Sequence, residues 1–277
     1  MNPGSARWLG GWSLIRLFTI LVYLFLFGPI LVVVLLAFNP AEYGSFPMQG
    51  VTLRWFGELA RNAQIVEAVK VSLLLGGLTT LISTAVGLAA ALALVRFEFP
   101  GKQVVNTLLT LPILVPHVVL GVALLLFLRS VGMTVSFGLL LLGHVVITLP
   151  FVILVVQARL YGVPRVYEEA AMSLGASRFH AFKDVTLPLL APAVVAGGLF
   201  AFTISFDEVT ATLFWKPVGI ETVPTQILAM LRLSISQEIN ALGTAMILFT
   251  VGLPLAAMAL TRALTRGDRP GNRRGGR

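Results

Sequence analysis

Long runs without a charged residue restrict the fold of this chain more than any other feature of its sequence. Each run is long enough for an α-helix to cross a hydrocarbon core about 30 Å thick, which needs about 20 residues. A membrane β-barrel would instead show segments of about 10 residues with alternating hydrophobicity. The runs without Asp, Glu, Lys or Arg are residues 17–41, 71–95, 103–128, 130–158, 185–206 and 239–261.

The sequence therefore predicts an all-α membrane protein with six transmembrane helices in one domain, residues 16–265. A cytoplasmic segment, residues 1–15, precedes this domain, and a basic tail, residues 266–277, follows it. The first span is expected to stay uncleaved, because its apolar stretch is too long for a signal peptide. The predicted spans are residues 16–38, 68–95, 104–128, 134–158, 188–214 and 239–262.

Composition supports a membrane protein and argues against several other classes. Only 12% of the residues are charged and 57% are hydrophobic, whereas about a quarter of a soluble domain is charged. So few polar residues could not cover the core of a soluble enzyme, a nucleic-acid-binding protein or a disordered scaffold. The chain has no cysteine, which excludes disulfides and Cys-ligated zinc.

The distribution of basic residues predicts the orientation. If the N-terminus is cytoplasmic, 14 of the 20 Lys and Arg residues lie in cytoplasmic segments, as the positive-inside rule requires. The chain is therefore expected to be a multi-pass protein of the cell inner (plasma) membrane, with both termini on the cytoplasmic side. The net charge of +8 is then explained by topology and needs no nucleic-acid partner.

The hydrophilic loop 159–187, between the fourth and fifth predicted spans, is expected to form two short helices. Pro164 favours the start of the first helix, and Gly175 can end it in a left-handed conformation. Ser177 can cap a second helix, Arg178–Asp184. From these residues alone, the loop is either an amphipathic segment lying on lipid or a docking surface for a cytoplasmic partner.

The same loop resembles a known family. Glu169-Ala170-Ala171, Gly175 and then Val185-Thr186-Leu187-Pro188 match the EAA–G–I-LP signature of binding-protein-dependent ABC importer permeases, with valine in place of isoleucine as the only departure. The resemblance implies a MetI-like permease fold whose coupling helices sit in a cleft of an ATP-binding subunit. The residues that it assigns to coupling are Glu168, Glu169, Ala170, Ala171, Gly175, Leu187 and Pro188.

Further segments resemble the spermidine/putrescine branch of that family. They are Ser205–Val209, Leu213-Phe214, Val223-Pro224 and Ser236–Leu242, and the resemblance extends over about residues 15–265. It implies a non-enzymatic transport subunit that moves polyamines inward by alternating access. A permease for an iron, opine or oxyanion solute and, less favoured, a secondary transporter remain as alternatives. A membrane enzyme is not favoured, because no H-E-x-x-H or G-x-S-x-G motif occurs.

Partners and cofactors follow from the resemblance. The chain contains no G-x-x-x-x-G-K-[ST] motif, so ATP and magnesium are expected on two copies of a separate ATP-binding subunit, with no cofactor in this chain. A second, different permease chain and a solute-binding protein on the outer face are expected to complete the transporter, which lies in the lipid bilayer.

Two adjacent carboxylates, Asp207 and Glu208, interrupt the otherwise apolar stretch Val194–Trp215. A charged side chain at the centre of a membrane helix costs roughly 2.5–3.5 kcal/mol on insertion scales. The pair therefore either marks the outer end of the fifth span or lines a path for a cationic substrate, and the family resemblance favours the path. Neighbouring helical residues point about 100° apart, so one of the two is expected to face the path, and Asp207 is the choice.

The remaining notable residues are expected to have structural roles and no catalytic or metal-binding role. His117, His144 and His180 are scattered, without H-x-x-x-H spacing or a nearby acidic residue, so no metal site is predicted. Pro112 and Pro116 are expected to kink the third span. Trp215, followed by Lys216, is predicted to anchor the fifth span at the membrane interface. Small residues at helical spacing predict close helix packing; they are Ser83, Gly87 and Ala91.

Overall fold

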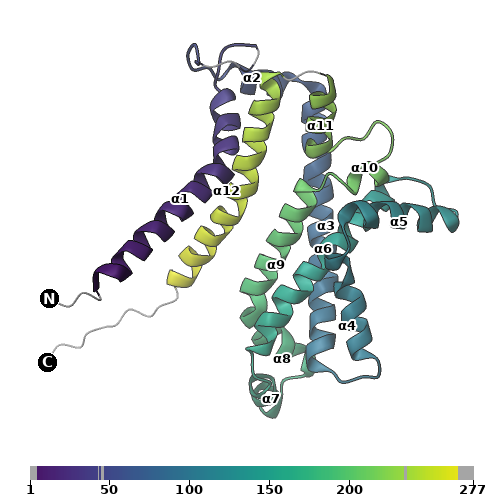
Figure 1. Ribbon diagram of the computed structural model, residues 1–277. Coiled ribbons are helices and arrows are strands. Elements are labelled where there is room, and N and C mark those ends of the chain that lie inside the picture. The colour runs from purple at the N-terminus through teal and green to yellow at the C-terminus, as the bar shows by residue number, and fades with distance from the viewer. Residues whose placement is uncertain (1–4, 43, 45–46, 234–235, 268–277) are drawn as a thin grey trace. The chain divides into compact units, whose positions relative to one another are not determined.

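Helices form all the regular structure in the residues that the computed structural model describes, which are 5–42, 44, 47–233 and 236–267 (Figure 1). Side chains are described from residue 14 to residue 259, so the end of the predicted tail, 268–277, lies outside the described residues. The helices are α1 (Ser5–Leu36), α2 (Arg54–Arg61), α3 (Ala63–Arg96), α4 (Lys102–Thr110), the 3₁₀ helix η1 (Leu111–Leu114), α5 (His117–Ser130), α6 (Phe137–Tyr161), α7 (Val166–Ser173), α8 (Arg178–Ala181), the π-helix η2 (Phe182–Thr186), α9 (Leu187–Asp207), α10 (Thr212–Trp215), α11 (Val223–Leu233) and α12 (Gln237–Gly267).

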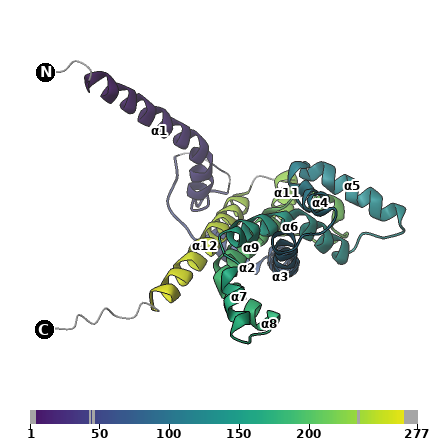
Figure 2. The same cartoon turned by 90° about the horizontal axis from the view of Figure 1, so that it is seen from below.

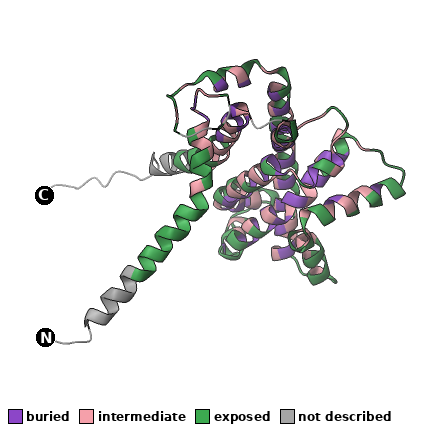
Figure 3. Cartoon of the chain, turned by 45° about the horizontal axis from the view of Figure 1, so that its top comes forward, coloured by how far each residue is buried: buried purple, intermediate pink, exposed green. Residues whose placement is uncertain are grey.

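The chain divides into two compact units. The first comprises Met1–Val66 and Ile227–Phe249, and the second comprises Glu67–Gln226 and Thr250–Arg277. In the first unit, most residues of α1 whose side chains are described are exposed and the others are partly buried (Figure 3). The most apolar window of this helix has none of its residues buried. An apolar helix that buries so little of its surface against the rest of the chain is suited to contact with lipid. The loop after α1 is held by the buried Trp55, whose Nε1 donates to the carbonyl oxygen of Asn39 at 2.7 Å.

The core of the second unit is built where α3, α6 and α9 pack closely. Val152 of α6 lies between two glycines: a Cβ added to Gly87 of α3 would come within 2.7 Å of its Cγ1, and one added to Gly197 of α9 would come within 3.3 Å. Ser83 hydrogen-bonds to Thr148 at 2.8 Å, and Ala91 is fully buried. The close packing predicted from the small residues of α3 is therefore confirmed.

The third predicted span, residues 104–128, has the kink expected from Pro112 and Pro116, but the bend is sharp enough to divide it into separate helices. It consists of α4 with η1, and then α5, which is bent from them by 116°. Pro112 and Pro116 lie at the break; proline has no N–H to donate and disfavours a helical conformation in the residue before it. Five helices of the described chain are therefore long and apolar enough to cross a membrane, or six if the bent pair counts as one span.

The fifth predicted span also differs. The helix α9 ends at Asp207 rather than near residue 214, and Glu208 takes an extended conformation with ψ 121°. After this break the chain turns into the short α10. The second helix of the predicted loop is also shorter than expected: α8 ends at Ala181, and the π-helix η2 carries the chain into α9.

Candidate functional site

The two short helices of the loop between α6 and α9 form a projecting hairpin at one end of the second unit (Figure 2). Gly175 separates them and has φ +94°, a left-handed conformation that favours glycine. The Ser177 hydroxyl accepts a hydrogen bond from the backbone N–H of His180 at 3.3 Å, which caps α8. Both features match the prediction from the sequence.

The hairpin presents apolar side chains at its surface. Leu174 is 90% exposed and Phe179 is 67% exposed, which is unusual for large apolar residues close together in the chain and is typical of an interaction surface. Among the residues assigned to coupling by sequence, the exposed ones are Glu169, Ala170, Gly175 and Pro188, and the partly buried ones are Glu168, Ala171 and Leu187.

The two adjacent glutamates of α7 differ in their surroundings. Glu168 forms an ion pair with Arg96 at the end of α3, with 3.1 Å between Nη2 and Oε1. The same Oε1 accepts a hydrogen bond from the hydroxyl of Thr186 at 2.8 Å. Glu169 is exposed. The sequence assigned both glutamates to the same surface, whereas the structure turns Glu168 toward the membrane-spanning helices.

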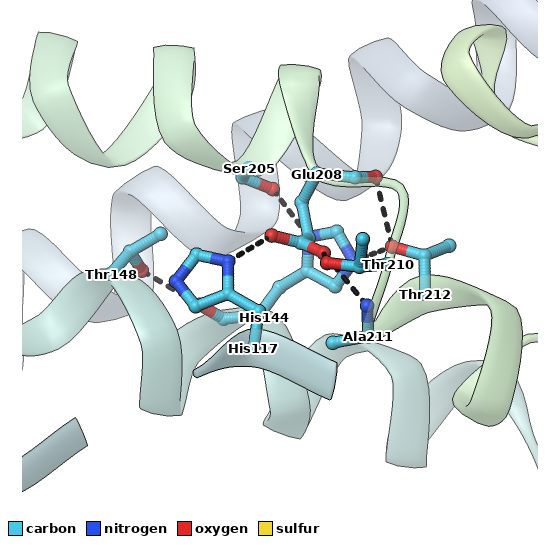
Figure 4. A network of polar contacts seen from close by, with 8 residues as sticks. All are labelled: His117, His144, Thr148, Ser205, Glu208, Thr210, Ala211 and Thr212. Atoms are coloured by element: carbon cyan, nitrogen blue, oxygen red, sulfur yellow. Dashed lines mark hydrogen bonds and ion pairs between the residues drawn. The ribbon is translucent and has the colours of Figure 1, made fainter. Parts of the chain in front are cut away.

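The second candidate region surrounds Glu208, where α9 breaks (Figure 4). Its side chain is 5% exposed, and Oε1 accepts hydrogen bonds from the Thr210 hydroxyl and the Ala211 N–H, both at 2.8 Å. Its Oε2 lies 2.5 Å from Nδ1 of His117, the first residue of α5. The inference that His117 has no nearby acidic partner is therefore wrong. The two residues are 91 positions apart, so no local sequence pattern could have paired them.

His144 of α6 contacts residues on both sides of the break that follows α9. Its Nδ1 lies 2.8 Å from the Ser205 hydroxyl and its Nε2 lies 2.9 Å from the Thr212 hydroxyl. Since the Thr212 hydroxyl donates to the carbonyl oxygen of Glu208 at 3.0 Å, it must accept from His144, so Nε2 of this ring carries the proton. His117 and His144 thus attach the broken end of α9 to α5 and to α6.

Asp207 is adjacent to Glu208 in the chain but takes no part in the polar contacts of Glu208, His117 and His144 described above. It is exposed, and its Oδ1 accepts a hydrogen bond from the hydroxyl of Thr250 at 3.2 Å. The adjacent Glu208 is buried and bonded within the bundle. Of the two carboxylates, Asp207 therefore has the exposed side chain.

Trp215 is fully buried, so the prediction that it anchors the span at the membrane interface is wrong. Its Nε1 donates to the carbonyl oxygen of Gly121 in α5 at 2.8 Å. Its ring lies directly against Gly143 of α6, where an added Cβ would be 2.1 Å from Cε3. The indole therefore fills the space that Gly143 leaves open.

No group of three or more His, Asp or Glu side chains able to hold a metal ion occurs among the described residues. The histidines of the second unit take part in pairwise contacts, His117 with a carboxylate and His144 with two hydroxyls.

Comparison with known proteins supports the family that the loop signature indicated. Residues 83–269 match the model of the "binding-protein-dependent transport system inner membrane component" family. The spermidine/putrescine transport system permease protein PotC of Escherichia coli K12 is 32% identical over 247 residues, which cover 89% of this chain and 93% of PotC. PotC of Haemophilus influenzae is 35% identical over 245 residues, 88% of this chain and 95% of that protein. The putrescine permease protein PotI of E. coli K12 is 34% identical over 249 residues, 87% of each chain.

Solved structures support the fold. A chain of a bacterial ABC transporter that imports the acidic polysaccharide alginate matches with a TM-score of 0.64 at 18% identity, over 94% of this chain and 96% of that one. A chain of an amino acid ABC transporter matches with a TM-score of 0.58 at 16% identity, over 77% of this chain and 100% of that one. The predicted all-α fold of an ABC importer permease is confirmed. The family match and the relatives together show that the chain belongs to the binding-protein-dependent inner membrane components, the non-enzymatic permease subunits of ABC importers.

Proposed function

We propose that this permease moves a polyamine, such as spermidine or putrescine, into the cell by alternating access. The relatives whose names include these solutes match almost the whole chain. The observation that carries the proposal is the exposed carboxylate of Asp207 at the broken end of α9. A polyamine is a chain of ammonium groups, and a carboxylate in a membrane-embedded path attracts a cation. Discontinuous helices are also typical of substrate paths in transporters.

The rest of the transporter follows from the hairpin of α7 and α8. Two copies of an ATP-binding subunit, which hold ATP and magnesium, dock on the coupling hairpins of this chain and of a second, different permease chain. A solute-binding protein delivers the polyamine at the outer face. Both termini of this chain, including segments 1–15 and 266–277, lie in the cytoplasm. Closure of the ATP-binding subunits moves the hairpins, and the spans open toward the outside.

Asp207→Asn is expected to lower polyamine uptake at least about fivefold, because one charge–charge contact at 4 Å is worth about 1 kcal/mol or more. The measurement is import of labelled spermidine and putrescine by the assembled transporter in proteoliposomes. The matched control is Glu67→Gln, which removes another exposed carboxylate, one that pairs with Lys70 on its own helix. Uptake by Asp207→Asn equal to that of the wild type would exclude Asp207 from the path.

Leu174→Asp is expected to weaken binding of the ATP-binding subunit about tenfold or more, because burying a leucine side chain against a partner contributes about 1.5–3 kcal/mol. Leu174 is 90% exposed in this chain alone, so the substitution removes no internal packing. Co-purification of the ATP-binding subunit from detergent measures the effect. Val218→Asp, in the connection between α10 and α11, alters a fully exposed residue far along the chain and should leave binding intact. Equal recovery with both variants would contradict docking on this hairpin.

A further inference from the structure

The carboxylate of Glu168 joins three parts of the second unit at the base of the hairpin. Arg96, the last residue of α3, donates from Nη2 to Glu168 at 3.1 Å and to the carbonyl oxygen of Val163 at 3.0 Å. Thr186, the last residue of η2 before α9 begins, donates to Glu168 at 2.8 Å. One side chain of α7 is therefore bonded both to the end of α3 and to the start of α9.

Apolar packing does not explain how α7 is held. All eight of its residues are described, and none of them is buried; in the following α8 only Ala181 is buried. A helix without buried side chains gains little orientation from packing, since the hydrophobic contribution scales with the area removed from water. Its position relative to the spans therefore depends on polar contacts at its base.

The ion pair at this base is well shielded. The Arg96 side chain is 11% exposed and that of Glu168 is 25% exposed. Arg165, which precedes α7, also donates to the backbone carbonyl oxygen of Arg96. Charge pairs in such positions are screened less by salt than surface pairs, and Nη2 of the Arg96 guanidinium donates to Glu168 and to Val163 at once.

The neighbouring pair of Lys102 and Glu98 shows the contrast. Its atoms are 2.8 Å apart, yet Glu98 is 89% exposed and the pair joins positions only four residues apart. Exposed pairs of this kind contribute little to stability, and this one connects no separate elements. It provides a matched comparison, because it lies just beyond the same end of α3.

We propose that Arg96, Glu168 and Thr186 form the mechanical link through which movement of the coupling hairpin reaches α3 and α9 together. The proposal rests on the docking of the ATP-binding subunit on this hairpin. Arg96 and Thr186 are positioning residues: they act through Glu168 and do not touch nucleotide or solute. Without the link, the hairpin moves with the ATP-binding subunit but its movement does not reach the membrane-spanning helices, so ATP is hydrolysed without transport.

The test uses the full transporter in proteoliposomes, with spermidine as the solute and its solute-binding protein present. Arg96→Gln is expected to lower the amount of spermidine imported per ATP hydrolysed by about 2-fold to 30-fold, the range for changes within a coupled network. The ATP-binding subunit should still co-purify, because the exposed face of the hairpin is unchanged. The double variant Arg96→Gln/Glu168→Gln should be no worse than the more affected single variant, as expected for residues that act as one unit.

Matched variants separate a link from a folding effect. Lys102→Gln removes a cation near the same end of α3 and should keep the wild-type ratio of spermidine imported to ATP hydrolysed. Arg96→Lys should give a ratio between those of the wild type and Arg96→Gln. Thr186→Val keeps the side-chain shape and removes only the hydroxyl, so it should lower the ratio even if Arg96→Gln is poorly folded. An unchanged ratio in Arg96→Gln and Thr186→Val, or additive losses in the double variant, would overturn the link.

The outcome also distinguishes the link from the function on which it rests. A wild-type chain that does not bind an ATP-binding subunit would overturn the docking proposal and the link with it. A wild-type transporter that hydrolyses ATP but imports no spermidine or putrescine would overturn only the polyamine assignment. In that case the link is measured as the stimulation of ATP hydrolysis by the solute-binding protein, which Arg96→Gln should lower and Lys102→Gln should not.

Discussion

Glu208→Ala is expected to destabilise the second unit by about 3 kcal/mol, because it leaves a buried N–H donor without its acceptor and removes two further hydrogen bonds. The substitution removes the acceptor of His117, of the Thr210 hydroxyl and of the Ala211 N–H. The Ala211 N–H is buried, so it has no water to replace the lost bond. The break between α9 and α10 is expected to loosen, and the folded fraction should fall.

The measurement is the unfolding free energy in mixed micelles, with thermal unfolding of the purified chain as a second readout. The unfolding free energy of Glu208→Gln should fall less than that of Glu208→Ala, because the glutamine amide oxygen can still accept the hydrogen bond from the Ala211 N–H. Asp207→Asn is the matched control, because Asp207 is the adjacent carboxylate and is exposed; its unfolding free energy should stay close to that of the wild type. If Glu208→Ala and Asp207→Asn unfold alike, the network around Glu208 does not stabilise the fold.

Gly143→Ala is expected to destabilise the second unit about as much as Glu208→Ala, although alanine favours a helix over glycine by about 0.5–1 kcal/mol. The added Cβ would be 2.1 Å from the ring of Trp215. This ring is fully buried and hydrogen-bonded to the carbonyl oxygen of Gly121, so it cannot move without losing that bond. Overpacking in a core costs about 1–3 kcal/mol, occasionally more, and the lost hydrogen bond adds to this cost.

Gly138→Ala in the same helix is the control. A Cβ there would have only the Ser136 hydroxyl near it, at 3.7 Å, so alanine should leave the stability unchanged or raise it slightly. Opposite signs for the two glycines, measured by unfolding of the purified chain, would confirm that Trp215 and not helix propensity decides at position 143. A stable Gly143→Ala variant would show that the indole can be accommodated elsewhere.

The two predictions concern the same region from opposite ends. Glu208 and Trp215 bracket the segment between α9 and the end of α10, and both bond to α5, through His117 and through Gly121. A segment fixed in this way holds the neighbouring Asp207 in a defined place at the end of α9. The side chains that position a proposed pathway residue are thus distinct from that residue.

Several parts of the structure were predictable because their signals are local. The length of the apolar runs sets the number of candidate spans, since a helix must satisfy its backbone within the bilayer. In the loop, Gly175 and Ser177 mark the turn and the cap, and the structure has a left-handed glycine and a side-chain cap at these positions. The spacing of Glu169, Gly175 and Pro188 was enough to indicate the family, which the comparisons show.

The size of the bend in the third predicted span and the break in the fifth were not predictable in the same way. Pro112 and Pro116 are visible in the sequence, but membrane helices often tolerate proline, so they do not by themselves imply a bend of 116°. The end of α9 at Asp207 depends on Glu208, which accepts the N–H of Ala211 and pairs with His117. That partner comes from another helix, and an apolar run cannot reveal it.

The sequence by itself determined the class of the protein, its apolar spans and the position of the loop that carries the family signature, because each depends on residues close together in the chain. Only the tertiary structure decided which carboxylate is buried, which histidine pairs with it and where Trp215 lies. It also decided that Glu168 faces Arg96 and Thr186 while Glu169 stays exposed. The physical reason is the same throughout: a charge near an apolar helix is stabilised by a specific partner, and folding brings that partner from a distant segment.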